Sequence, residues 1–296
     1  MKRILLFVAT NLAIMVTLSI VLSLLGISGY VQDGQLDMGM LLAFCFVWGM
    51  GGAFISLLLS RVIAKWAMGV QVVDGQTGQA ELDWLYQTVR RLTVQAQLPM
   101  PEVGVYDSPE VNAFATGPSK RKSLVAVSSG LLRMMPREEV EGVLAHEVSH
   151  IQNGDMVTMT LIQGVVNAFV MFLARIVAFA VRQGSDSRNA YMLSFVVMIV
   201  LQIVLGILGS LIVAWFSRAR EFRADAGGAA LAGRGNMIAA LRRLSGTKQL
   251  VDNREPALAT LKINGARGWM ALASTHPPIE ERIRALEQAP LAGHRM

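Results

Sequence analysis

His146-Glu147-Val148-Ser149-His150 is an H-E-x-x-H sequence, and Asn153-Gly154-Asp155 follows it just before a long apolar segment. Histidines four residues apart lie on one face of a helix, so both imidazoles can reach one metal ion. Glu147 then projects beside that metal, where its carboxylate can take a proton from a water molecule that the metal activates. The motif therefore predicts a catalytic zinc site on a helix, with Glu147 as general base and acid.

Four apolar runs are each long enough to cross a membrane as a helix: 4–27, 38–63, 157–181 and 191–216. A bilayer core of about 30 Å requires roughly 20 apolar residues. A signal peptide is the alternative for the first run, but the run is longer than the about 7–15 residues of a signal sequence core. A buried hairpin is the alternative for the last two runs, but it would need a larger soluble chain around it. We therefore expect four transmembrane helices.

The third and fourth runs contain polar residues, namely Gln163, Asn167, Arg175 and Gln202. Such residues in a membrane helix indicate contact with other helices or with a wet cavity rather than with lipid.

Basic residues at the ends of the runs predict the orientation of the chain. Lys2 and Arg3 precede the first run and Arg61 and Lys65 follow the second, whereas the loop between these runs has no Lys or Arg. Cytoplasmic loops are enriched in Lys and Arg. We therefore expect the amino terminus, residues 64–156 and residues 217–296 to be cytoplasmic, and the turn at 182–190 to lie outside.

The cysteine count and the net charge exclude several classes of protein. Cys45 is the only cysteine, so neither an internal disulfide nor a zinc ribbon is possible. The net charge of +6 comes mostly from basic residues beside the membrane ends, which indicates topology and contact with anionic lipid rather than nucleic acid.

Residues 64–156 and 217–296 together are long enough for one compact soluble core. Residues 1–63 and 157–216 hold the two pairs of membrane helices. Hydrophobic periodicity and turn residues predict short strands at 70–73, 102–106, 111–116 and 123–128, and helices at 80–97, 136–152, 217–231, 236–244 and 277–288. The expected fold is an α-helical membrane protein with a small α+β cytoplasmic protease domain of the zincin type (gluzincin).

The third metal ligand is less clear from the residues alone. Catalytic zinc usually has three protein ligands, and because Cys45 lies in a membrane run, the candidates are a distant carboxylate or His276. Glu221 and Asp225 are one helical turn apart, so one can bind the metal while the other orients a ligand histidine. Pairing of both with Arg218, Arg220 or Arg223 is the alternative. Two membrane crossings would return Glu221 to the side of His150, within about 10 Å of the same membrane face.

The chain resembles the HtpX family, the bacterial inner-membrane heat-shock zinc metalloproteases related to the CAAX prenyl proteases. The resemblance covers essentially the whole chain, and its motifs are specific in combination. The matching segments are Asn112-Ala113-Phe114-Ala115-Thr116-Gly117, the metal motif with Asn153-Gly154-Asp155, Arg220 to Asp225, and Thr275-His276-Pro277-Pro278.

The resemblance implies one Zn²⁺ per chain, bound by His146, His150 and Glu221, with Glu147 as the catalytic base and Asp225 behind the ligands. It also implies a multi-pass protein of the bacterial inner membrane that cuts misfolded or damaged membrane proteins on the cytoplasmic side. We find no departure from the family's pattern at these positions, so we expect an active enzyme.

Two further roles are open to a simpler interpretation. Pro277 and Pro278 would stiffen the loop of His276, which could then stabilise the oxyanion of the transition state, but a helix-capping or surface histidine fits equally well. The segment Asn112-Ala113-Phe114 could begin an edge strand to which an extended substrate adds, or it could belong to an ordinary internal strand.

Two other classes of protein were weighed against a surface-sited protease. An intramembrane protease would bury its metal motif in lipid, but Arg137, Glu138, Glu139 and Asp155 flank the motif here. A transporter or scaffold would leave Glu147 and the ligand set unexplained.

Overall fold

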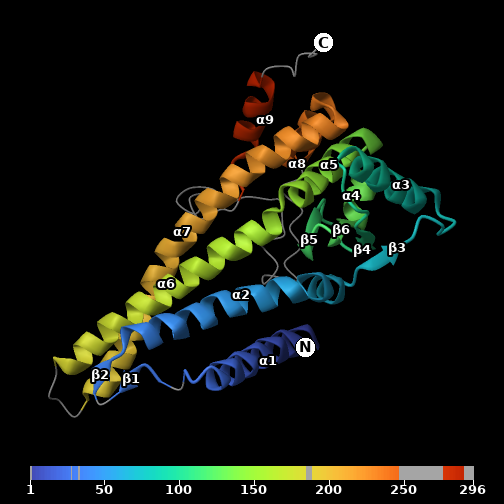
Figure 1. Cartoon of the computed structure of the whole chain (residues 1–296). Coiled ribbons are helices and arrows are strands. Elements are labelled where there is room, and N and C mark those ends of the chain that lie inside the picture. The colour runs from blue at the N-terminus through green and yellow to red at the C-terminus, as the bar shows by residue number, and fades with distance from the viewer. Residues whose placement is uncertain (1, 28, 33, 185–188, 247–275, 290–296) are drawn as a thin grey trace. The chain divides into compact units, whose positions relative to one another are not determined.

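A computed structural model of the chain describes residues 2–27, 29–32, 34–184, 189–246 and 276–289 (Figure 1). The chain forms two compact units. Unit 1 comprises residues 1–57 and 158–213, and unit 2 comprises residues 58–157 and 214–296. The boundaries between the units fall inside three long helices, α2 (Met38–Met68), α6 (Asp155–Gln183) and α7 (Ala190–Ala232).

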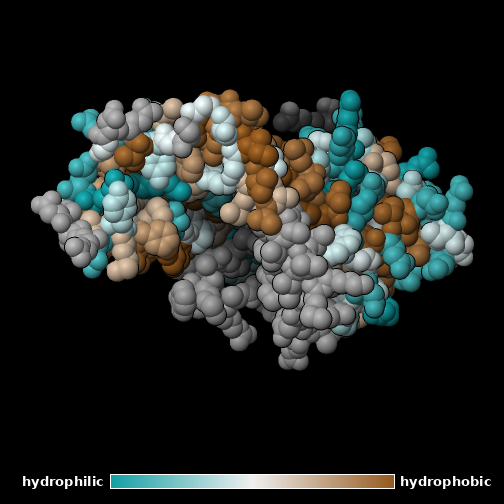
Figure 2. Space-filling view, turned by 90° about the horizontal axis from the view of Figure 1, so that it is seen from below, coloured by the Kyte–Doolittle hydropathy of each residue, from teal (hydrophilic) through white to brown (hydrophobic). Residues whose placement is uncertain are grey.

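These three helices are long and apolar enough to cross a membrane, and within the described residues no other helix meets both conditions. They contain the predicted runs 38–63, 157–181 and 191–216. Large hydrophobic side chains such as Phe169, Phe195 and Ile207 are exposed on them, and exposed hydrophobic residues colour much of the surface in Figure 2 brown. This much apolar surface suits a lipid environment rather than water.

The first predicted run is also a helix, α1 (Lys2–Leu24). The side chains that the structure describes begin at Leu12. The apolar segment Leu12–Leu24 is shorter than a membrane span. The expectation of a fourth membrane helix therefore still rests on the sequence.

Unit 1 is held together by close contacts between glycines and neighbouring helices. A Cβ atom on Gly49 of α2 would lie 2.8 Å from the Cα of Ala168 on α6, and one on Gly164 of α6 would lie 3.3 Å from the Cα of Met50. Such small residues let membrane helices approach closely. A short hairpin of β1 (Val31–Gln32) and β2 (Gln35–Leu36) connects α1 and α2. The side-chain amide of Gln183 donates to the carbonyl of Gly34 at 2.9 Å, so the end of α6 lies beside this hairpin.

Unit 2 contains a four-stranded sheet with the order β3-β4-β6-β5. The strands are β3 (Gln71–Val73), β4 (Glu102–Tyr106), β5 (Ala113–Ser119) and β6 (Lys122–Ser128). β4 and β6 are parallel, and the other neighbours are antiparallel. The four predicted strands are thus confirmed, although β5 begins two residues later and ends three residues later than expected.

Three helices come before α6 in unit 2: α3 (Ala80–Gln95), α4 (Ser129–Met134) and α5 (Arg137–Asn153). Apolar side chains of α3, α5 and the sheet form one core that includes Leu85, Val89, Val125, Val127 and Leu144. The helices α8 (Arg234–Gly246) and α9 (Ile279–Gln288) add Leu241 and Ile279 to this core. Helix α4 was not predicted, because its six residues are too few to show a periodicity.

Helix α7 corrects one expectation about the elements. The predicted segment 217–231 is not a separate helix but continues the fourth apolar run, so that one helix of 43 residues extends to Ala232. The hydropathy changes at Ser217, but no proline interrupts the helix there. It ends only at Gly233, whose φ of 89° is in the left-handed region that favours glycine.

Candidate metal centre

Helix α5 carries the H-E-x-x-H motif through the core of unit 2. His146, Glu147 and His150 are all buried. Pro136 caps the start of the helix, where Glu138 and Glu139 complement the positive end of its dipole. Gly154 ends the helix with a φ of 70°, and α6 begins at the next residue, Asp155. The helix predicted at 136–152 is therefore confirmed, with each end one residue later.

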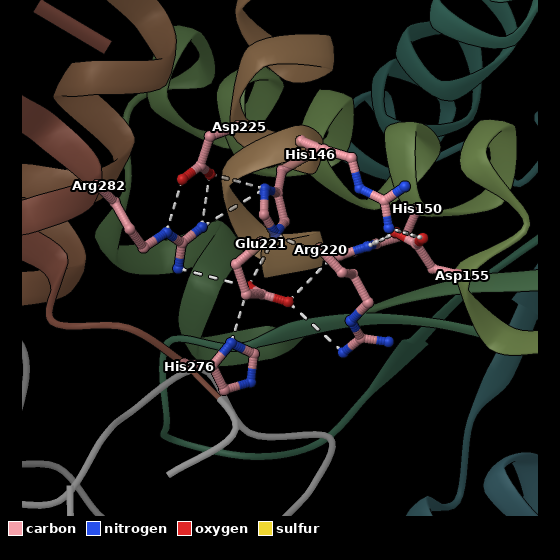
Figure 3. A network of polar contacts seen from close by, with 9 residues as sticks. His146, His150, Asp155, Arg220, Glu221, Asp225, His276 and Arg282 are labelled. Carbon is pink, nitrogen blue, oxygen red and sulfur yellow. Dashed lines mark hydrogen bonds and ion pairs between the residues drawn. The ribbon is translucent and has the colours of Figure 1, made fainter. Parts of the chain in front are cut away.

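Glu221 of α7 meets the two histidines of α5 (Figure 3). The Nε2 atoms of His146 and His150 are 3.1 Å apart. One Glu221 oxygen lies 3.5 Å from the Nε2 of His146, and the other lies 3.4 Å from that of His150. The three side chains thus bring one ligand atom each into a triangle, and their potential ligand atoms all lie within 4.8 Å of one another.

The dimensions of this triangle fit zinc. At ligand distances of about 2.0–2.1 Å, tetrahedral geometry separates neighbouring ligand atoms by about 3.3 Å. The two histidine nitrogens are 3.1 Å apart, and each lies 3.4–3.5 Å from a different oxygen of Glu221, so the three side chains surround a space of about this size. Two histidines and one glutamate are also a donor set that zinc enzymes use.

A carboxylate holds the second nitrogen of each histidine. Asp225 lies 2.9 Å from the Nδ1 of His146, and Asp155 lies 2.7 Å from the Nδ1 of His150. When each Nδ1–H donates to its carboxylate, the lone pairs of both Nε2 atoms face the centre of the triangle. Two nitrogen lone pairs that face each other at 3.1 Å repel, so this arrangement requires a proton or a cation between them.

The same carboxylates make the histidines strongly basic. Burial by itself lowers the pKa of His146, but hydrogen bonds with Asp225 and Glu221 raise it to about 9. Burial likewise opposes protonation of His150, whereas Asp155 and Glu221 raise its pKa. The pKa of Glu221 is held well below its usual range, because His276, His146 and His150 outweigh the effect of burial. In the absence of metal, the centre therefore takes up protons.

Two glycines allow α7 to cross α5 closely enough for this contact. A Cβ atom on Gly227 would overlap the hydroxyl of Ser149, and one on Gly228 would lie 3.2 Å from the Cα of His146. On the same helix, Asp225 lies less than one turn before these glycines and Glu221 about two turns before them. The close crossing therefore places both carboxylates at the histidines.

Arg282 of α9 supports Asp225 from behind. Its Nε and Nη2 atoms donate to the two oxygens of Asp225 at 2.7 and 2.6 Å, and its Nη1 lies 3.6 Å from Glu221. The side chain is only 2% exposed. Burial opposes its charge, but the carboxylates of Asp225, Glu221 and Glu147 raise the pKa of Arg282 above its usual value.

His276 also reaches the centre. Its Nδ1 lies 2.8 Å from an oxygen of Glu221, just before α9 begins (Figure 3). The structure therefore brings together six of the residues that the sequence singled out: His146, Glu147, His150, Glu221, Asp225 and His276.

The three tentative substrate-binding residues lie elsewhere in unit 2, at the start of β5. Asn112, Ala113 and Phe114 are buried. The amide of Asn112 donates to the hydroxyl of Tyr106 at 2.8 Å, and the ring of Phe114 packs against that of Tyr106. Their side chains therefore serve the core. Within the described residues β5 pairs only with β6. It is therefore an edge strand, and its outer edge pairs with no other strand.

The sequence did not reveal the roles of Asp155 and Arg282. In the sequence, Asp155 is only a charged residue that flanks the motif, although its place directly after a glycine turn lets the chain fold back to His150. Arg282 contacts Asp225 across 57 residues, and neither the periodicity nor the spacing of α9 signals that contact.

Comparison with known proteins identifies the family of this chain. The model of Peptidase family M48 matches residues 79–289. A protease HtpX homolog of Paracidovorax citrulli (strain AAC00-1) is 55% identical over 295 residues, which cover 98% of this chain and 99% of the relative. Protease HtpX of Idiomarina loihiensis is 52% identical over 291 residues, covering 97% of this chain and 99% of the relative.

A solved structure is similar in fold. The crystal structure of S. mikatae Ste24p superposes with a TM-score of 0.62 at 18% identity, covering 97% of this chain and 66% of that chain. At this identity the similarity concerns the fold alone.

Proposed function

This chain belongs to Peptidase family M48, and we propose that it is a zinc endopeptidase. It is a membrane-bound metalloprotease, and its relatives include the HtpX proteases. We propose that it cuts misfolded or damaged membrane proteins at the cytoplasmic face of the bacterial inner membrane. The observation that carries the proposal is the buried cluster of His146, His150 and Glu221, in which one potential ligand atom from each side chain lies within 4.8 Å of the others. Its proposed ligands are these three side chains.

Zinc in this position would supply Lewis-acid activation of a water molecule and of the scissile carbonyl. Glu147 takes the proton of the attacking water and delivers it to the nitrogen of the leaving amine. Asp225 and Asp155 hold the ligand histidines in the tautomer that presents Nε2 to the metal. Arg282 holds Asp225 in place through two hydrogen bonds.

His276 is the proposed oxyanion stabiliser. Its contact with Glu221 brings a second hydrogen-bond donor to the edge of the metal triangle, and such donors stabilise charge that develops in the transition state. We propose that an extended substrate binds by pairing with the outer edge of β5. Backbone pairing there would bind extended chains with little dependence on their side chains, which suits a protease for unfolded segments.

The proposed architecture has four membrane spans, with α1 as the first, and an α+β peptidase unit of the gluzincin type. The basic residues beside the first two spans favour a cytoplasmic peptidase unit. A substrate tethered to the same membrane would meet the site at a raised effective concentration. This is the reason for proposing membrane proteins as substrates.

The proposal is tested by comparing three glutamate variants of the purified full-length chain. Glu147→Gln should retain zinc and lose at least about 10²–10⁴-fold in the rate of cleaving an unfolded test protein. Glu221→Gln should lose both zinc and activity. The control is Glu281→Gln, because Glu281 is exposed on α9, and it should change neither. Zinc content is measured by elemental analysis on the same samples. Normal cleavage by Glu147→Gln would refute the mechanism.

A further inference from the structure

Unit 1 contains a cavity of about 390 Å³ between α6, α7 and the connection that follows α1. Its wall is formed by two matching helix faces. One side is lined by positions i, i+4 and i+7 of α6, which are Arg175, Phe179 and Arg182. The other side is lined by positions i and i+4 of α7, which are Tyr191 and Phe195. The principal lining residues are Arg175, Phe179, Arg182, Tyr191, Phe195 and Tyr30. Residues at these spacings share one face of a helix, so both arginines point to the same cavity.

The two arginines have little to neutralise them. One nitrogen of Arg175 donates to the carbonyl of Met171 at 3.2 Å, and its Nε is buried without a hydrogen-bond partner among the described residues. Its guanidinium lies 5.1 Å from the ring centre of Phe44, and that of Arg182 lies 4.3 Å from the ring centre of Tyr191. Within the part of the chain that the structure describes, neither forms an ion pair with a carboxylate. Two positive charges therefore face the cavity with aromatic rings as their main partners.

The position of Arg175 makes this arrangement costly without a ligand. It lies eight residues before the end of α6, which is about 12 Å along the helix. That depth is inside or at the edge of the hydrocarbon region for a helix of this length. Charged residues at such depth are rare and usually mark a site that serves a function.

The chemistry of the cavity points to its ligand. A guanidinium offers five N–H donors in a planar fork that matches the oxygens of a phosphate, and Arg175 has donors to spare. Tyr30 and Tyr191 add an amphipathic rim of the kind found where lipid headgroups begin. Phe179 and Phe195 provide the apolar wall along which an acyl chain would lie.

We propose that this cavity binds the phosphate headgroup of an anionic glycerophospholipid, with Arg175 and Arg182 as its ligands. The volume is in the range of small-ligand sites. The site belongs to unit 1 alone and is independent of the metal centre and of the proposed protease function.

The experiment measures lipid binding by native mass spectrometry on the full-length protein in a non-ionic detergent. The probes are phosphatidylglycerol, phosphatidylcholine and inorganic phosphate. The variants are Arg175→Gln/Arg182→Gln, Arg175→Lys/Arg182→Lys and a control, Arg121→Gln/Arg133→Gln. The control removes the same charge from two exposed arginines of unit 2.

The wild type and the control should bind one phosphatidylglycerol per chain and prefer it to phosphatidylcholine. The double glutamine variant should bind phosphatidylglycerol at least about tenfold more weakly, and the lysine variant should lie between, because lysine keeps the charge but not the fork. Circular dichroism reports whether the helices remain. If the double variant loses helix, Arg182→Gln alone, at the end of α6, should still weaken binding.

Three results would overturn the proposal. The first is equal binding of phosphatidylglycerol by the wild type and by folded glutamine variants. The second is equal binding of phosphatidylglycerol and phosphatidylcholine by the wild type. The third is binding of inorganic phosphate as tight as that of the lipid, which would identify a free anion as the ligand.

Discussion

Each metal-facing histidine is fixed by its own aspartate, and the two aspartates come from different helices. Asp155 begins α6, whereas Asp225 lies near the end of α7. Each carboxylate lies within hydrogen-bond distance of an Nδ1, and when it accepts from Nδ1–H, the Nε2 of that histidine is left for the proposed metal. An aspartate in this position also raises the basicity of the ligand, which strengthens its bond to zinc.

We therefore predict that Asp155→Asn and Asp225→Asn each weaken zinc binding about 10–100-fold. Asparagine keeps the shape and one acceptor oxygen but removes the charge. Competition with a chelator of known affinity measures the effect. Asp107→Asn is the control, because Asp107 is exposed and its carboxylate accepts from Ser129 instead. Unchanged zinc affinity in both variants would show that the aspartates do not tune the ligands.

The pKa of about 9 for His146 predicts opposite effects of pH on the metal-free and metal-bound protein. The folded state raises the pKa of this histidine above its ordinary 6.5. Its protonation therefore stabilises the metal-free fold fully below pH 6.5, and this contribution is lost as pH rises through about 9. Zinc must displace that proton, so zinc affinity should rise over the same interval by up to about tenfold per pH unit, and level off above it.

Two measurements check this pair of effects. Thermal unfolding of the metal-free protein should move to lower temperature between pH 6.5 and 9, and chelator competition should show tighter zinc binding over the same range. In Asp225→Asn both trends should shift to lower pH, because the strongest hydrogen-bonding partner of His146 has lost its charge. A zinc affinity that does not vary with pH would contradict the assignment of His146.

At the scale of elements, the crossing of α5 and α7 decides whether the ligands meet. Gly227 leaves room for Ser149: a Cβ atom there would overlap the hydroxyl of Ser149 and lie 3.0 Å from its Cβ, so the serine must turn away or the helices must separate. We predict that Gly227→Ala destabilises the protein by about 1–3 kcal/mol and lowers zinc occupancy. Gly206→Ala on the same helix is the matched control, because a Cβ atom there meets nothing within 4 Å. Alanine in that open position should leave stability unchanged or raise it.

Thermal unfolding and elemental analysis of the two variants provide the comparison. A second substitution, Ser149→Gly, should restore part of the loss in Gly227→Ala because it removes the overlapping hydroxyl. Equal unfolding temperatures for Gly227→Ala and Gly206→Ala would show that the crossing tolerates a wider spacing.

The elements that could be predicted from sequence are those with a local signal. Strand β4 has the predicted bounds, and α5 differs from its prediction by one residue at each end. The pairing of His146, His150 and Glu221 could also be anticipated, since the motif names two ligands and the returning hairpin suggests the third. The polar residue Arg175 in an apolar run indicated a helix contact or a wet cavity. The contact of Arg282 with Asp225 and the other residues that line the cavity at Arg175 could not be predicted, because they depend on which helix faces meet after folding.

At the scale of the whole molecule, the membrane helices interrupt the peptidase unit. Residues 58–157 and 214–296 form one compact unit although residues 158–213 separate them. In unit 1, Gln183 contacts Gly34, so the end of α6 lies beside the hairpin between α1 and α2. This agrees with two hairpins that enter and leave the membrane on the same side.

We predict that topology reporters fused after residue 130 and after residue 290 report the cytoplasm, whereas one near residue 186 reports the outside. The basic flanks of the first two runs determine the direction. Reporters that place the two large segments on opposite sides of the membrane would separate His150 from Glu221 and refute the whole assignment of the site.

The order of the ligands along the chain also has a consequence for biosynthesis. His146 and His150 leave the ribosome before the α6–α7 hairpin, and Glu221 follows only after it. At synthesis rates of about 5–20 residues per second, the delay between His150 and Glu221 is roughly 4–14 s. During this time the nascent chain has two of its three proposed ligands and no Asp225 to orient His146. With the proposed ligand set, the newly made protein would acquire its protease activity only after Glu221 and Asp225 of α7 have been synthesised.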